Sequence, residues 1–200
     1  AEGYVVFFDN HRGSSSYGEE FSMLLHNKYS SEYDFADHNS GVDAMLGLGF
    51  IDKNNLFITG GSAGGIAAAY AIGLTDRFNA SGVIKPIVNW LSKSLYADSS
   101  TGQLRNQFPG YPWDHVDHFW KRSPMSLVGN VKTPTLLMTG EQDRRTPIAE
   151  IEQYYQALKL LGVDTIMVRV PGSPHGIAGK PSRLNAKVDN IMAWFERYKK

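Results

Sequence analysis

Short runs of apolar residues alternate along this chain with longer stretches in which apolar positions recur at helical spacing. Continuous apolar runs of four to six residues are typical of strands that are buried on both faces of a parallel sheet. The run at 4–8 is predicted to be a central strand, and Arg169 in the last run indicates a strand at the sheet edge. The predicted strands cover residues 4–8, 56–59, 80–84, 135–139 and 165–170.

Apolar residues three or four positions apart predict helices between these strands. Gly49 is expected to end the first helix, and Thr146 with Pro147 is expected to cap the third. Strands that alternate with helices in this way favour an α/β fold with a mostly parallel sheet. The segment at 96–126 departs from the pattern, and we predict an irregular, aromatic-rich insertion without a strand. The predicted helices cover residues 33–48, 66–71, 146–162 and 184–198.

Composition narrows the class of protein. With 200 residues, 42% hydrophobic and 20% charged, the chain fits one domain spanning 1–200. The formal net charge is zero, so no broad basic face for nucleic acid or for an anionic membrane is expected. No apolar stretch reaches membrane-spanning length. The absence of cysteine excludes a thiol nucleophile and thiolate metal sites but leaves the cellular compartment open.

A glycine-rich motif stands between the strand at 56–59 and the helix that follows it. Residues 60–65 read Gly-Gly-Ser-Ala-Gly-Gly and contain the pattern G-x-S-x-G. In a nucleophile elbow this pattern places the serine on a tight strand-to-helix turn. The motif therefore indicates acyl transfer through a covalent intermediate on Ser62. The alternative is a plain glycine-rich turn in which Ser62 caps the helix.

A serine nucleophile needs a base and a group that orients the base. Asp143 follows the strand at 135–139, and His175 follows the strand at 165–170. The carboxyl ends of parallel strands meet at one crevice, so these loops are expected to converge on Ser62. In this interpretation His175 is the general base, Asp143 orients it, and the N–H of Ala63 binds the oxyanion.

Each of these residues also has a structural interpretation. His175 could be a loop histidine held by local bonds. Glu141 could take the place of Asp143, and Asp143 could instead form a surface ion pair with Arg144 or Arg145. The order serine, aspartate, histidine along the chain matches the order in α/β-hydrolases, which favours the catalytic interpretation.

The segment 114–118, Asp-His-Val-Asp-His, places four potential metal ligands in five positions. Because no further ligands follow at a defined spacing, we interpret this segment as a polar turn in the insertion. We expect neither a metal nor a cofactor.

Several ordered motifs together resemble the prolyl oligopeptidase family of serine peptidases, and its acylaminoacyl-peptidase-like branch in particular. The resemblance implies an α/β-hydrolase fold, action on short peptides, and triad roles for Ser62, Asp143 and His175. It also implies that Ile87 and Trp90 help to form the primary specificity pocket, although Trp90 could be plain core. The motifs are 10–19, the elbow and the small residues after it, 75–78, 85–90, 121–124 and the two loops that contain Asp143 and His175.

The chain departs from the family pattern at its front. Family members have an upstream β-propeller, the first strands of the hydrolase sheet, and a loop that supplies the second oxyanion donor. None of these is found in the sequence, so the fold is expected to lack its first strands. Without them the run at 4–8 and the strand at 56–59 would leave backbone groups unpaired. We therefore expect an N-terminal part of the same protein, or self-association, to complete the domain.

Three functions remain open at this point. The first is a serine peptidase that releases dipeptides or acylated amino acids from short peptides. The second is a carboxylesterase or lipase with the same triad, because the fold hosts both chemistries. The third is an inactive fragment that acts as a binding scaffold, because a missing oxyanion donor lowers turnover by roughly 100- to 1,000-fold.

Overall fold

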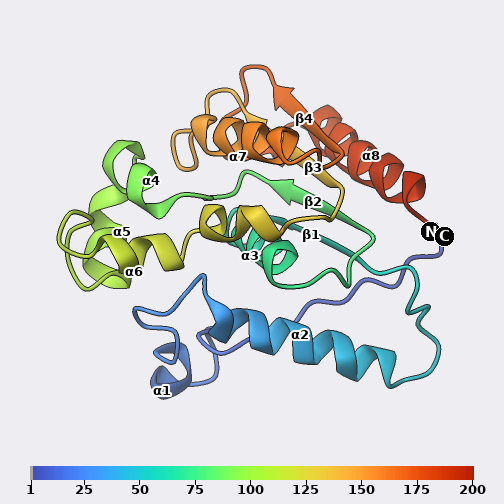
Figure 1. Cartoon of the computed structure of the whole chain (residues 1–200), viewed down its shortest axis with the longest axis horizontal. Coiled ribbons are helices and arrows are strands. Elements are labelled where there is room, and N and C mark those ends of the chain that lie inside the picture. The colour runs from blue at the N-terminus through green and yellow to red at the C-terminus, as the bar shows by residue number, and fades with distance from the viewer. Residues whose placement is uncertain (1) are drawn as a thin grey trace.

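In the computed structural model, which describes residues 2–200, a parallel four-stranded sheet has helices on both faces (Figure 1). The strand order is β1-β2-β3-β4, and each neighbouring pair is parallel. Four of the predicted strands are thereby confirmed, and β4, which contains Arg169, lies at an edge of the described sheet. The strands are β1 (Phe57–Gly61), β2 (Ala80–Ile84), β3 (Thr135–Gly140) and β4 (Thr165–Val170).

Two hydrophobic clusters cover the two faces of the sheet. On β3, Leu137 packs into the first cluster, with helices α3 (Ala63–Leu74) and α7 (Ala149–Leu160). Its neighbours Leu136 and Met138 pack into the second, with helix α8 (Pro181–Arg197). Successive side chains of a strand point to opposite faces, so a strand covered on both sides needs an unbroken apolar run.

The glycine in the middle of β2 is explained by the neighbouring strand. A Cβ on Gly82 would stand 2.8 Å from the hydroxyl oxygen of Thr59 on β1. That hydroxyl donates a 2.8 Å hydrogen bond to the carbonyl oxygen of Gly82. The glycine therefore makes room for a side chain that ties β1 to β2.

The prediction of a central strand at 4–8 is wrong. These residues are in no strand, and Val5, Val6 and Phe8 are 55%, 80% and 86% exposed. Tyr4 is anchored, since its ring meets that of Phe57 and its hydroxyl donates to Glu196 at 2.8 Å. The apolar run met the local requirement for a strand, but no described segment pairs with its backbone.

The N-terminal third of the described chain contains the short helix α1 (Glu19–Ser22) and the long helix α2 (Glu32–Leu46). Helix α2 lies against α3 and runs along one side of the molecule (Figure 1). Ser31 and Asp34 form a capping box at the start of α2, and Gly49 turns the chain with φ +80° shortly after its end. The predicted helix at 33–48 is therefore confirmed.

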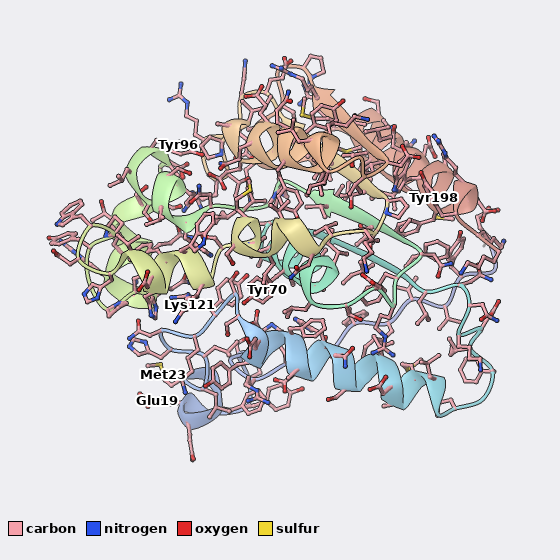
Figure 2. The ribbon with its side chains drawn as sticks, viewed as in Figure 1. Glu19, Met23, Tyr70, Tyr96, Lys121 and Tyr198 are labelled. Carbon is pink, nitrogen blue, oxygen red and sulfur yellow. The ribbon has the colours of Figure 1, made fainter. Side chains whose placement is uncertain are left out.

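The insertion at 96–126 contains no strand among the described residues, as predicted, but it is more helical than expected. Two of its aromatic side chains, Phe108 and Phe119, form a third cluster with Ile87 and Trp90, which follow β2. The hydroxyl of Tyr70 on α3 donates to the carbonyl oxygen of Lys121 at 3.1 Å and ties this region to the sheet layer (Figure 2). The helices in and next to the insertion are α4 (Trp90–Tyr96), α5 (Ser100–Gln107), α6 (Val116–Lys121) and the 3-10 helix η1 (Pro124–Asn130).

Arg122 is a buried cation that joins three segments. Its guanidinium donates to the carbonyl oxygens of Tyr29 at 2.6 Å and Gln107 at 2.5 Å, and it lies 4.2 Å from the ring centre of Phe108. Burial lowers the pKa of Arg122 to about 10. The side chain therefore holds the insertion against the N-terminal loops.

Replacing Arg122 with methionine is expected to lower the free energy of unfolding by about 2 to 5 kcal/mol, because two partly buried carbonyl oxygens lose their donor. Urea unfolding measures this change. Arg105→Met, at an exposed position on α5, is the control and should stay within about 0.5 kcal/mol of the wild type. Equal stability of the two variants would contradict the anchoring role.

Candidate active site

Ser62 stands at the turn between β1 and α3, in a backbone conformation that few non-glycine residues adopt. Its φ is +59° and its ψ is −116°, and its N–H donates to the carbonyl oxygen of Ile84 on β2 at 3.0 Å. Strained conformations of this kind are concentrated at functional sites. A Cβ at Gly60 would stand 2.2 Å from the carbonyl oxygen of Gly64, so the turn requires glycine there.

Three side chains from different loops form one hydrogen-bonded line. The hydroxyl oxygen Oγ of Ser62 lies 2.9 Å from Nε2 of His175. On the other side of the ring, Nδ1 of His175 lies 2.7 Å from Oδ2 of Asp143. The Asp143 side chain is fully buried, whereas the His175 side chain is 27% exposed. The imidazole can therefore accept the serine proton at one nitrogen while the buried carboxylate holds the other.

The loops that bear Asp143 and His175 are fixed to each other where β3 and β4 end. The N–H of Gln142 donates to the carbonyl oxygen of Ser173 at 3.0 Å. A Cβ at Gly140 would stand 2.1 Å from that same carbonyl oxygen, so only glycine permits this approach. The convergence expected for the carboxyl ends of parallel strands is thus present in this structure.

The Asp143 carboxylate is held by donors besides His175. Its Oδ1 accepts from the N–H groups of Arg145 and Thr146, each at 2.9 Å, and its Oδ2 accepts from the Thr146 hydroxyl at 3.0 Å. Burial on its own would raise the pKa of Asp143. The hydrogen bonds from His175 and Thr146 outweigh burial, and the pKa lies below its usual value.

This lowered pKa predicts how stability depends on pH. The folded protein loses the Asp143 proton at a lower pH than the unfolded chain does, so the ionised carboxylate stabilises the fold above pH 3.8. That contribution is lost as the pH falls through the folded pKa. We therefore expect wild type to exceed Asp143→Asn in stability at pH 7, and the difference to shrink below pH 3.8.

Urea unfolding at a series of pH values measures that difference. Asp189→Asn, at an exposed position, is the control and should give a difference near zero throughout. A gap between wild type and Asp143→Asn that stays constant across the series would show that the carboxylate gains nothing from its donors.

Thr146 was predicted to cap the helix at 146–162, and this prediction is wrong. Helix α7 begins at Ala149, and Ile148 precedes it without a side-chain cap. The Thr146 hydroxyl is used by the site instead, where it lies 3.0 Å from Oδ2 of Asp143 and 3.3 Å from Nδ1 of His175. A local Thr-Pro signal could not show that a carboxylate three residues earlier would compete for this hydroxyl.

The alternatives to Asp143 have other partners. Glu141 pairs with Arg169 at 3.2 Å on the surface. Arg145 pairs with Asp98 at 2.6 Å, away from the Asp143 carboxylate. Asp143 is therefore the acid that contacts His175, and it forms no surface ion pair with Arg145.

The predicted specificity residues Ile87 and Trp90 are both buried in the third cluster. Their loop is anchored by Glu150, whose Oε2 accepts from the N–H groups of Val88 at 2.7 Å and Asn89 at 3.0 Å. Burial raises the pKa of Glu150. The contact of Ile87 and Trp90 with substrate stays a prediction, because in this structure they pack against protein.

The other candidate ligands do not assemble. Within residues 2–200 no group of three histidine, aspartate or glutamate side chains is arranged to hold a metal ion. His118, from the segment 114–118, lies 3.1 Å from the Arg122 guanidinium instead. No helix in the described range has the length and apolar character needed to cross a membrane.

Lys85 lies near the site, and the sequence interpretation included it in the motif at 85–90 without giving it a role. Its ammonium donates to the backbone carbonyl oxygen of His175 at 2.7 Å, across 90 positions of the chain. The residue also has φ +44°, which is unusual for a lysine. No local pattern identifies a contact between positions so far apart.

Comparisons with known proteins agree with this geometry. Residues 1–200 match the prolyl oligopeptidase family. The chain is 34% identical to the uncharacterized peptidase YuxL of Bacillus subtilis, over 99% of this chain and 30% of that protein. It is 31% identical to acylamino-acid-releasing enzyme 1 of rice, Oryza sativa subsp. japonica, over 99% of this chain and 27% of that enzyme.

Solved structures give the same answer. The uncomplexed acylaminoacyl peptidase of Pyrococcus horikoshii superposes with a TM-score of 0.90 and 29% identity, covering 96% of this chain and 32% of that one. The chain thus spans less than a third of the length of these relatives. The fold is that of α/β-hydrolase peptidases, and the chain belongs to the prolyl oligopeptidase family.

Proposed function

We propose that this chain is the catalytic part of a serine peptidase that cleaves short peptides through an acyl-enzyme intermediate. The observation that supports this most strongly is the line of hydrogen bonds from Ser62 through His175 to the buried carboxylate of Asp143. The proposed substrates are peptides from which an acylated amino acid or a dipeptide is released.

In the proposed mechanism, Ser62 Oγ attacks the carbonyl carbon of the scissile bond while Nε2 of His175 takes its proton. Asp143 holds Nδ1 and stabilises the imidazolium ion that forms. His175 then delivers the proton to the leaving amine, and water hydrolyses the acyl-enzyme by the same steps in reverse order.

The N–H of Ala63 is the proposed oxyanion donor. Ala63 is the first residue of α3, so its N–H has no acceptor within the helix and points toward the region where negative charge develops. Hydrolysis of this kind ordinarily uses two donors. We propose that the second donor comes from an N-terminal part of the same protein or from a second copy of the chain, since the relatives extend well beyond the matched span.

The substrate class is proposed from the relatives, which include the acylamino-acid-releasing enzyme 1 of rice and an acylaminoacyl peptidase of Pyrococcus horikoshii. A panel of anilides with one common leaving group tests it. We expect faster cleavage of an N-acetylated amino acid anilide or a dipeptide anilide than of longer peptidyl anilides.

A matched nitrophenyl ester of the same acetylated amino acid separates the peptidase from an esterase. Esters are intrinsically easier to cleave, so ester cleavage alone does not support the proposal. Cleavage of the ester with no measurable cleavage of any anilide would favour the carboxylesterase or lipase. The absence of both, with no covalent labelling of Ser62, would favour the binding scaffold.

A further inference from the structure

Lys85 links the loop that bears the base to the turn that bears the nucleophile. It directly follows β2, and its Nζ donates to the backbone carbonyl oxygen of His175 at 2.7 Å. On the way its Cε passes 3.4 Å from the point where a Cβ on Gly61 would stand. One side chain therefore passes close to the residue before Ser62 and bonds to the backbone of His175.

The backbone around Lys85 is fixed to the turn that bears Ser62 and to β3. The carbonyl oxygen of Ile84 accepts from the N–H of Ser62 at 3.0 Å, and the N–H of Lys85 donates to the carbonyl oxygen of Met138 on β3 at 2.6 Å. The chain then leaves the sheet through the positive φ of Lys85. This conformation directs the side chain across the end of the sheet, and left-handed backbone at a non-glycine residue frequently marks a functional position.

The His175 carbonyl oxygen has a second donor, the N–H of Ile177 at 3.0 Å. That bond joins residues two apart within one loop, so it shapes the loop but cannot place it against Ser62. The bond from Lys85 spans 90 positions, and besides the Ser62–His175 bond itself it ties this loop to the strand end that binds the Ser62 N–H.

The surroundings of Lys85 agree with a fixed position. Burial lowers the pKa of Lys85, the Asp143 carboxylate opposes this effect, and the nearby Lys187 adds to it. A partly buried ammonium group needs a hydrogen-bond acceptor, and the His175 carbonyl oxygen supplies one. The bond is thus expected to persist in solution.

We propose that Lys85 is a positioning residue, which holds the His175 loop against the nucleophile turn so that the imidazole stays within reach of Ser62. This inference rests on the proposed function. Lys85 does not touch the reacting atoms, and it acts through the backbone of His175. Its loss should therefore slow the chemical step and leave substrate binding nearly unchanged.

The test compares Lys85→Met, Lys85→Arg and Lys187→Met. Lys85→Met keeps the length and the backbone strain but removes the donor, and we expect kcat to fall about 10- to 100-fold, since a displacement of about 1 Å at such a site costs about 100-fold. KM should change less than about twofold, because Lys85 takes no part in binding the substrate. The rate constant for labelling by a fluorophosphonate should fall in parallel with kcat.

Lys85→Arg restores the donor and should recover most of the lost rate. Lys187→Met removes a nearby positive charge that makes no bond to the His175 loop, and it should behave like the wild type. Full activity in Lys85→Met would overturn the inference, and so would an equal loss in Lys187→Met, since charge alone would then explain the effect.

A wild type that the fluorophosphonate does not label would contradict the proposed function but not the positioning role. A crystal structure of Lys85→Met then decides the inference. We predict that the distance from Nε2 of His175 to Oγ of Ser62 exceeds the hydrogen-bond limit of about 3.2 Å. A distance unchanged from 2.9 Å would overturn it.

Discussion

His175→Ala is expected to lower kcat by about 10⁵- to 10⁶-fold, because triad members act as a unit and the serine loses its only base. The fold should survive, since the His175 side chain is partly exposed and makes its bonds within the site. Hydrolysis of a reactive nitrophenyl ester measures the loss over a wide range, and urea unfolding shows whether the variant is folded.

The control for this variant is His26→Ala, at an exposed position distant in sequence from the site. It should retain the activity of the wild type. If His175→Ala kept more than about a tenth of the wild-type kcat, the loss would be too small for a general base, which contributes about 100-fold or more. That result would contradict the role of His175.

Gly60→Ala is expected to destabilise the fold by about 3 kcal/mol or more, at the upper end of the usual cost of overpacking. The new Cβ would stand 2.2 Å from the carbonyl oxygen of Gly64, and both groups belong to backbone that cannot rotate away. Relief requires β1 and α3 to separate at the turn that holds Ser62. Activity should therefore be lost together with stability.

Gly64→Ala is a matched control in the same motif. A Cβ at Gly64 meets nothing within 4 Å, and alanine in a helix is favoured over glycine by up to about 1 kcal/mol. This variant should be as stable as the wild type or slightly more stable. If the two variants were destabilised equally, the close approach of β1 and α3 would not be what requires Gly60. The glycines would then be needed for the flexibility of the backbone. Urea unfolding of both variants decides the question.

The sequence was most informative where a local pattern reflects a requirement of the whole fold. The unbroken apolar run of β3 follows from burial on both faces, as Leu137 and its neighbours show. Asp143 and His175 could be placed together because parallel strands end at one edge. The elbow was recognisable because a tight turn between strand and helix admits few residue types, and Gly60 shows the reason.

The sequence failed where a distant partner decides the outcome. The run at 4–8 has the composition of a strand, but a strand also needs a neighbouring backbone, and the described residues supply none. Thr146 has the local signal of a helix cap, yet its hydroxyl bonds to Asp143. The bond from Lys85 to His175 spans 90 positions and produces no pattern of residue spacing in the sequence.

The helices of the insertion were missed for a related reason. Isolated helices of six to eight residues are not stable by propensity alone. Here they are held by tertiary contacts, among them the stacked rings of Phe108 and Phe119, 4.0 Å apart, and the buried guanidinium of Arg122. Such contacts join segments whose pairing cannot be read from spacing.

The central claim is that Ser62 is a nucleophile activated by His175 and Asp143. The most direct test treats the wild type and Ser62→Ala with a fluorophosphonate and measures intact mass, followed by peptide mapping. We predict one covalent adduct on the wild type, located on Ser62, and none on Ser62→Ala. An unlabelled wild type, or an adduct that persists in Ser62→Ala, would contradict the account.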